Sequence, residues 1–353
     1  MKIERGQVRA PDIGRVWLNS APLSLRQLRG RAVLIDFWDY TCVNCIRTLP
    51  YVQAWHERYA EKGLTVIGVH TPEFTFAQYE SNLERGAREF GLTYPIVIDS
   101  NYELWQAFAN RAWPAKYLID KEGYVRFAHL GEGAYGETEA AIQELLREIN
   151  PAVALPAIME PLRPEDEPGA VCYQPSPELY LGHRRGRIGN EGGFQEDRTG
   201  DYAFTGQPED NVFYATGRWA STAEYLESAA ASPLKPTSGL SEPPDENKIT
   251  LKYSAAAVNL VMASRQASSC EVLIRQDGKP LSSSQATPDV EFRNEHGASE
   301  SLLVVSKPRM YRLVDNRDFG DHVLELSTKA PGLALYAFTF TGCVSSPVPV
   351  GKR

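Results

Sequence analysis

The sequence predicts an α/β domain with a mixed central sheet, followed by an all-β sandwich domain of the jelly-roll kind. Up to about residue 150, short apolar strands alternate with helical patterns. Residues 151–170 then carry prolines at 151, 156, 161, 164 and 168, the composition of a semi-rigid extended linker. From Val171 onward helical patterns nearly vanish, and short β-rich runs separated by glycine- and proline-bearing turns replace them.

A chain of 353 residues is too long for one ordinary core. We therefore expect domains at 1–150 and 171–345, joined by the linker 151–170 and followed by a tail at 346–353. The formal charge of −8 argues against nucleic acid as a partner, because neutralising phosphates requires a basic face. No run of about 18 apolar residues predicts a membrane span.

The compartment stays open on the sequence. Residues 1–6 lack the apolar core of a signal peptide, so the chain as written is expected to be cytoplasmic. If it is part of a longer protein, an extracytoplasmic or periplasmic place is expected instead.

The elements of the first domain follow from hydrophobic periodicity. The strand at 33–38 is nearly continuous apolar sequence, as expected for a central strand buried on both faces. In the helix after it, apolar residues recur every three or four positions. The other expected strands are 64–69, 95–99, 115–119 and 125–129. The expected helices are 46–61, 76–90, 103–110 and 138–149.

Cys42 and Cys45 lie at the joint between the first strand and the first helix. At a helix N-terminus, unpaired N–H groups and the helix dipole stabilise a thiolate, so we expect Cys42 to be ionised at neutral pH. Cys45, one turn later, is placed to attack a mixed disulfide. Because no second C-x-x-C or H-x3-5-H occurs in the sequence, we expect no metal at this pair.

These motifs resemble the thioredoxin superfamily. They comprise the run Phe37–Arg47 with its two cysteines, the run Gly68–Phe74, and Trp113-Pro114 before a strand. In more detail they are similar to the TlpA-like redoxin part of DipZ-type proteins, in which a carbohydrate-binding-module-like β domain follows. The resemblance implies a thioredoxin fold with an inserted strand and helix at residues 70–99.

The resemblance also implies roles for individual residues. Cys42 is the expected nucleophile and Cys45 the resolving thiol, with Asp36 and Glu73 as candidate proton acceptors. A lone carboxylate in a buried strand is costly to ionise, so the pKa of Asp36 should be raised. The lysine that pairs with this acid in thioredoxin falls at Gly68 here. Pro114 is the expected cis-proline, and Trp113, Pro114, Trp38 and Tyr40 are the candidate substrate-binding residues, with Trp38 first a packing residue.

The expected function is thiol–disulfide exchange with partner proteins, with the Cys42–Cys45 disulfide as the redox centre and no other cofactor. The direction of electron flow stays open, because Val43-Asn44 replaces the dipeptide of ordinary thioredoxin. One alternative is a thiol peroxidase, although the residues upstream of both cysteines lack the peroxidase pattern. Another is a module that binds a polysaccharide or a protein and localises the redox domain. An upstream electron donor is expected, in DipZ-type proteins a CcdA-like membrane module.

The second domain is expected to hold about ten strands. They are residues 178–182, 202–205, 212–219, 249–253, 258–262, 271–275, 301–305, 311–314, 322–326 and 333–340, with an exposed loop at 228–247. A glycan would need aromatic platforms, and the candidates are Trp219, Tyr180, Tyr202, Tyr214 and Tyr253, most of which we expect in the core. Cys172 and Cys343 are expected either to pair or to remain free buried thiols, and Cys270 stands alone.

Overall fold

The computed structural model describes residues 1–353 except 5, 15, 231–245, 296–297 and 345–353. It divides into two compact units, Met1–Asp166 and Glu167–Arg353. The predicted loop at 228–247 lies largely outside the described residues, and the predicted tail at 346–353 lies wholly outside them.

The first unit is built on a six-stranded mixed sheet in the order β1-β4-β3-β2-β5-β6. Its strands are β1 (Trp17–Leu18), β2 (Ala32–Trp38), β3 (Leu64–His70), β4 (Ile96–Ile98), β5 (Ala115–Ile119) and β6 (Val125–Leu130). Its helices are α1 (Val43–Tyr59), α2 (Glu80–Glu89), α3 (Glu103–Ala107) and α4 (Tyr135–Ile149), with 3₁₀ turns η1 (Ala60–Lys62), η2 (Thr75–Gln78) and η3 (Pro164–Asp166). The predicted thioredoxin-like α/β fold is confirmed.

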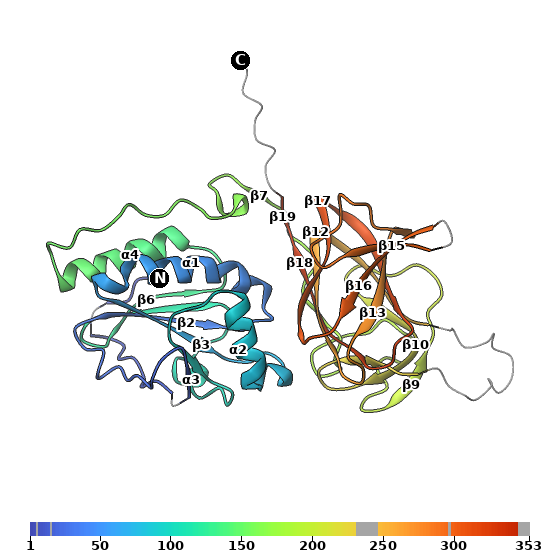
Figure 1. Ribbon diagram of the computed structural model, residues 1–353, viewed down its shortest axis with the longest axis horizontal. Helices are drawn as coiled ribbons and strands as arrows, with labels where there is room; N and C mark the ends of the chain where they lie inside the picture. The colour runs from blue at the N-terminus through green and yellow to red at the C-terminus, as the bar shows by residue number, and fades with distance from the viewer. Residues whose placement is uncertain (5, 15, 231–245, 296–297, 345–353) are drawn as a thin grey trace, which may run out of the picture. The chain divides into compact units, whose positions relative to one another are not determined.

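Strand β2 lies at the centre of this sheet and is buried along its whole length, which explains its apolar sequence. It pairs in parallel with β3 and antiparallel with β5. Alternate side chains point to opposite faces. Val33, Ile35 and Phe37 share a core with α3, whereas α1 and α4 lie together on the other side of the sheet (Figure 1). Asp36 therefore points away from the α3 core.

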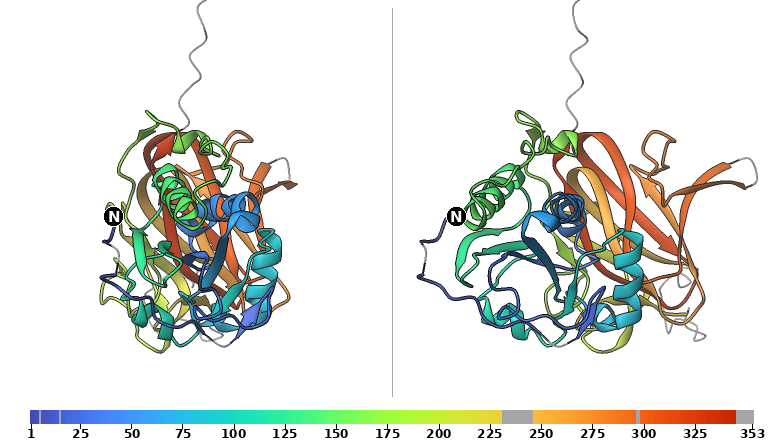
Figure 2. Two further views of the ribbon diagram at one scale, coloured as in Figure 1. Left: turned by 90° about the vertical axis from the view of Figure 1, so that its left-hand side faces the viewer. Right: turned by 60° about the vertical axis from the view of Figure 1, so that its left-hand side comes forward.

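Every described element of the second unit is a strand (Figure 2). The elements are β7 (Val171–Cys172), β8 (Leu179–Tyr180), β9 (Thr199–Tyr202), β10 (Phe213–Ser221), β11 (Leu226–Ser228), β12 (Asn247–Ser264), β13 (Cys270–Gln276), β14 (Lys279–Pro280), β15 (Glu291–Glu295), β16 (Ala298–Val305), β17 (Arg309–Thr328), β18 (Leu333–Thr341) and β19 (Cys343–Val344). Eleven of them form one sheet that surrounds a single hydrophobic core. The all-β prediction is confirmed.

Two long strands, β12 and β17, organise this unit. Each merges two runs that the sequence predicts as separate strands, and they pair with each other over most of their lengths. Strand β12 also pairs with β10 through its first part and with β18 through its second part. Register shifts near Ala255–Ala257 mark the place where β12 changes this partner.

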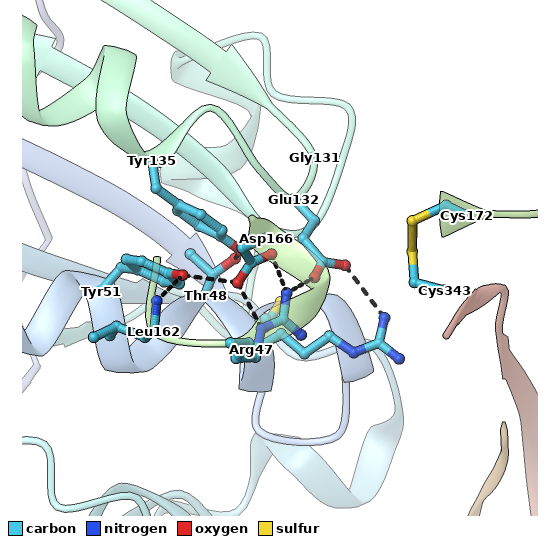
Figure 3. A network of polar contacts seen from close by, with 12 residues as sticks. Arg47, Thr48, Tyr51, Gly131, Glu132, Tyr135, Leu162, Asp166, Cys172 and Cys343 are labelled. Atoms are coloured by element: carbon cyan, nitrogen blue, oxygen red, sulfur yellow. Dashed lines mark hydrogen bonds and ion pairs between the residues drawn. A yellow bond between two sulfur atoms is a disulfide. The ribbon is translucent and has the colours of Figure 1, made fainter. Parts of the chain in front are cut away.

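A disulfide joins Cys172 to Cys343, which face each other in the two-stranded pair β7–β19 (Figure 3). The sequence left this pairing open, and the structure decides it. The bond connects the two ends of the all-β unit across a sequence separation of 171 residues. Cys270 is free and buried.

Candidate active site

Cys42 and Cys45 occupy the start of α1, as their spacing predicts. Cys42 is the N-cap residue, and its Sγ accepts a hydrogen bond from the backbone N–H of Cys45 at 3.2 Å. Both thiols are free in the structure. Cys42 is half-buried, whereas Cys45 has no exposed surface. Of the two residues, only Cys42 therefore has exposed surface.

The expectation that Cys42 is ionised at neutral pH is wrong for this reduced form. Burial raises the pKa of the Cys42 thiol, and the nearby charges of Glu73 and Asp39 raise it further. Its hydrogen-bonding with Cys45 acts in the opposite direction and does not outweigh them. Burial also raises the pKa of Cys45 well above the ordinary thiol value. The helix N-terminus supplies the expected hydrogen bond to Cys42, but desolvation and the neighbouring carboxylates have the larger effect on the pKa of its thiol.

Asp36 lies on the α1 and α4 side of the sheet and is fully buried. No described residue donates a hydrogen bond to either of its carboxylate oxygens. Burial raises its pKa to about 7, while the charge of Lys116 lowers it. The predicted rise is confirmed. The charge of Asp36 also raises the pKa of Cys45, so the protonation state of the carboxyl affects that of the thiol.

Lys116 is a buried cation that the sequence interpretation missed. It is the direct cross-strand partner of Asp36 in β5 and has no exposed surface. Burial lowers the pKa of Lys116, and the charge of Asp36 raises it. Its Nζ lies 3.5 Å from the carbonyl oxygen of Gly131 and 5.3 Å from the ring centre of Tyr135. The sequence did contain a signal for Lys116, since it lies in the predicted strand 115–119. Burying a charged lysine costs as much free energy as burying the charged aspartate.

The bond between Trp113 and Pro114 is cis, as the sequence predicts. Pro114 is buried and Trp113 half-buried at the start of β5. The indole Nε1 of Trp113 donates to the carbonyl oxygen of Thr71 at 2.9 Å, and its ring lies 4.2 Å from that of Trp105. These contacts fix Trp113 beside the segment that follows β3.

Trp38 and Tyr40 are packing residues in the structure. Their exposed fractions are 0% and 3%, so neither ring presents a surface to a substrate. Both rings contact the buried imidazole of His70, Trp38 edge-on and Tyr40 stacked. The burial of Trp38 agrees with the expectation that it is first a packing residue, and neither ring offers an exposed surface for the expected contact with substrate.

Glu73 is half-buried in the segment that links β3 to η2. Its backbone N–H donates to the carboxylate of Asp39 at 2.6 Å, and its charge acts on Cys42. Asp39 is a second fully buried carboxylate that the sequence interpretation missed. It lies outside the apolar strand, in the loop before Cys42, where an aspartate ordinarily signals a turn.

A network of polar contacts joins the first helix to the end of this unit (Figure 3). Arg47, two residues after Cys45, contacts Glu132 at 3.3 Å, and Glu132 also pairs with Arg163 at 2.7 Å. Arg163 pairs with Asp166, which accepts a hydrogen bond from Tyr51 in α1. The proline-rich segment is therefore attached to the helix that carries Cys45.

The described residues contain no group of three or more His, Cys, Asp or Glu side chains placed to hold a metal ion. Of the helices in the described ranges, none is long and apolar enough to cross a membrane.

The AhpC/TSA family matches residues 7–128, and the family described as the thioredoxin-like C-terminal domain matches residues 176–341. The thiol-disulfide oxidoreductase ResA of Halalkalibacterium halodurans is 31% identical over 134 residues, which cover 38% of this chain and 71% of ResA. The chain belongs to the thioredoxin superfamily. Its first unit is related to the ResA-like thiol-disulfide oxidoreductases.

Protein DipZ of Mycobacterium bovis is similar along nearly the whole chain, with 36% identity over 338 residues. The match covers 94% of this chain but only 42% of DipZ, so the chain spans less than half of that relative. Among solved structures, a thiol-disulfide isomerase from Corynebacterium glutamicum is 24% identical, with a TM-score of 0.36, covering 39% of this chain and 96% of that one.

The second unit buries most of the aromatic residues that could serve as sugar platforms. The exposed fractions of Trp219, Tyr202, Tyr214 and Tyr253 are 1%, 6%, 6% and 1%. The partly exposed ring of Tyr180 carries the guanidinium of Arg185 3.5 Å from its centre. The expectation that most of these rings serve the core is confirmed.

Proposed function

We propose that this protein is a thiol–disulfide oxidoreductase that reduces disulfides in partner proteins. The observation that carries the proposal is the asymmetric pair at the start of α1, with Cys42 accessible and Cys45 buried beside it. The ResA relationship of the first unit supports the same chemistry. In this proposal the redox work belongs to residues 1–150, and the Cys42–Cys45 disulfide is its only redox group.

In the first step, Cys42 loses its proton and its sulfur attacks one sulfur of the substrate disulfide. The substrate S–S bond breaks, a mixed disulfide forms, and the departing substrate thiolate takes up a proton. In the second step, Cys45 loses its proton and attacks the Cys42 sulfur, releasing the second substrate thiol. Two electrons pass to the substrate, and the protein is left with a Cys42–Cys45 disulfide.

Asp36 is the proposed acceptor for the proton of Cys45. A carboxyl group with a pKa of about 7 is half ionised at neutral pH, so it accepts and returns a proton with little cost. Lys116 is proposed to keep enough of this carboxyl ionised, because its charge opposes the effect of burial. Glu73 is proposed to accept the proton of Cys42, since its charge acts on that thiol.

The charges around the sulfurs favour the reducing direction. Strong protein oxidants stabilise their reduced form, usually through a thiolate of low pKa. Here burial raises the pKa of both thiols, so the reduced form gains no such stabilisation at neutral pH. We therefore expect the pair to act as a reductant, recharged by an external dithiol donor such as a CcdA-like membrane module.

The test is insulin reduction by the wild-type protein and by Cys42→Ser. We expect the wild-type protein to reduce insulin and the Cys42→Ser variant to show only the background rate. Equal rates in the two proteins would remove the proposal. Equilibration with glutathione or thioredoxin then gives the reduction potential. A value near −270 mV is expected for a reductant, and a value near −120 mV would reverse the direction.

A thiol peroxidase is the second candidate, because the AhpC/TSA family matches residues 7–128. Peroxide consumption by the reduced protein is the direct assay. Turnover of hydrogen peroxide comparable to insulin reduction would favour the peroxidase. Consumption no faster than that of free dithiothreitol would leave the reductase.

For the second unit, Glu167–Arg353, we propose that no sugar is bound by stacking on its aromatic rings. The burial of the candidate rings Trp219, Tyr202, Tyr214 and Tyr253 argues against stacking of these rings on a glycan. A glycan array probed with the whole protein tests this, and retention of any polysaccharide would reverse the assignment.

A further inference from the structure

Asp39 has an unusual place between the two segments that surround Cys42. It follows β2 directly and precedes the cysteine pair by three residues. Asp39 has no exposed surface. The loop that it begins ends at Cys42, which is half-buried. A buried carboxylate must obtain its stabilisation from hydrogen bonds within the protein.

Three hydrogen bonds reach this carboxylate. One oxygen accepts from the backbone N–H of Thr41 at 2.7 Å and from the hydroxyl of Thr41 at 2.8 Å. The other oxygen accepts from the backbone N–H of Glu73 at 2.6 Å. The first two bonds close the loop in front of Cys42. The third crosses to a segment 34 residues away in the sequence.

The backbone of Asp39 contacts the cysteines as well. Its carbonyl oxygen accepts from the N–H of Cys42 at 3.3 Å. Its backbone also hydrogen-bonds to Cys45, a contact that lowers the pKa of that thiol. One residue therefore connects both cysteines with the segment that carries Glu73.

We propose that Asp39 is a positioning residue that ties the Cys42 loop to the Glu73 segment and so keeps two carboxyl groups beside the nucleophilic sulfur. The inference rests on the proposed role of Cys42 as the nucleophile. The charged groups that act on this sulfur are Glu73 and Asp39 themselves, with Cys45 as the neighbouring thiol. Both carboxylates disfavour the thiolate, which is the form that reacts.

The experiment is the pH dependence of Cys42 alkylation by iodoacetamide in the reduced full-length protein. Fragment ions in tandem mass spectrometry assign the label to Cys42 rather than to Cys45, which lies in the same peptide. Cys45 and Cys270 are both buried. In Asp39→Asn the charge is removed, and the side chain keeps only one acceptor oxygen for the bonds that the two carboxylate oxygens accept from Thr41 and Glu73. We expect the alkylation midpoint to fall by about one pH unit, as for the loss of a like charge. The rate at pH 7 should rise about threefold, because a thiolate of lower pKa is also less nucleophilic.

The matched control is Thr41→Val, which removes only the hydroxyl donor and leaves the charge of Asp39 and its bond to Glu73 in place. Its midpoint should equal that of the wild type. An unchanged midpoint in Asp39→Asn, or an equal fall in Thr41→Val, would overturn the proposal, since a loosened loop would then explain the effect.

If Asp39→Asn does not fold, Glu73→Gln replaces it, because it removes the second charge and keeps the backbone N–H. A lowered midpoint supports the arrangement, and an unchanged midpoint overturns it. Alkylation requires no disulfide turnover. A protein that failed to reduce insulin would still show the shift, so failure of the proposed function and failure of this inference are distinguishable.

Discussion

Replacing Asp36 by asparagine should make the stability of the first unit less dependent on pH. In the folded protein burial raises the pKa of this carboxyl from 3.8 to about 7. Below pH 3.8 the group is protonated in both the folded and the unfolded chain and has no effect. Between 3.8 and 7 only the unfolded chain ionises, so stability falls as pH rises. Above 7 the full cost is present, about 4 kcal/mol at about 1.4 kcal/mol per pH unit.

The measurement is denaturant unfolding at pH 5 and pH 8, followed by tryptophan fluorescence. Five of the six tryptophans lie before residue 150, so the signal reports mainly on the first unit. The gain in stability from Asp36→Asn should be larger at pH 8 than at pH 5 by about 3 kcal/mol. His70, whose pKa burial lowers to about 3, contributes with the opposite sign below pH 6.5 and cancels in this comparison. An equal gain at both pH values would refute the reasoning.

Three further changes test other parts of the structure. Lys116→Met should move the pH midpoint of insulin reduction upward, because the lysine charge lowers the pKa of Asp36; an unmoved midpoint would separate Lys116 from the reaction. Replacing Cys172 and Cys343 together by serine should cost the second unit up to about 5 kcal/mol, measured by denaturant unfolding followed by circular dichroism, since the bond closes a very long loop; unaltered stability would contradict the chain-entropy argument. Gly68→Ala should destabilise the first unit by about 1–3 kcal/mol in the fluorescence assay, because its Cβ would lie 2.9 Å from both Trp38 and Tyr94; a neutral effect would show that these rings yield.

The elements of the first unit were predictable because each carries its own periodic signal. A strand such as β2, buried on both faces, has a continuous apolar run, and α1 has apolar residues at helical spacing. The second unit was harder to predict in detail. Strands β12 and β17 are each longer than the predicted runs, because small or polar residues in the middle, such as Ser254–Ala256, interrupt the hydrophobic pattern without ending the pairing.

The site was predictable as far as it follows from positions near the cysteines. The cis bond before Pro114 was expected from the resemblance to thioredoxins, and the raised pKa of Asp36 from the burial of a carboxylate in an apolar strand. The place of Lys116 beside Asp36 could not be predicted in this way, because it depends on which strand pairs with β2. The thioredoxin pattern directed attention to Gly68 on the β3 side, whereas the structure places the cation on the β5 side.

The ionisation of Cys42 shows why a helix N-terminus alone does not determine reactivity. The hydrogen bond from the helix is present, yet its donor is a neutral N–H group, and burial removes water from the thiol that accepts it. Two carboxylates supplied by different segments act on the same sulfur, and their combined effect with burial exceeds that of the helix. Because a C-x-x-C pair of this geometry can serve oxidants and reductants alike, the surrounding charges decide between them. Carboxylates beside the sulfurs withhold the thiolate stabilisation that an oxidant needs, and this is the basis on which we propose the reducing direction.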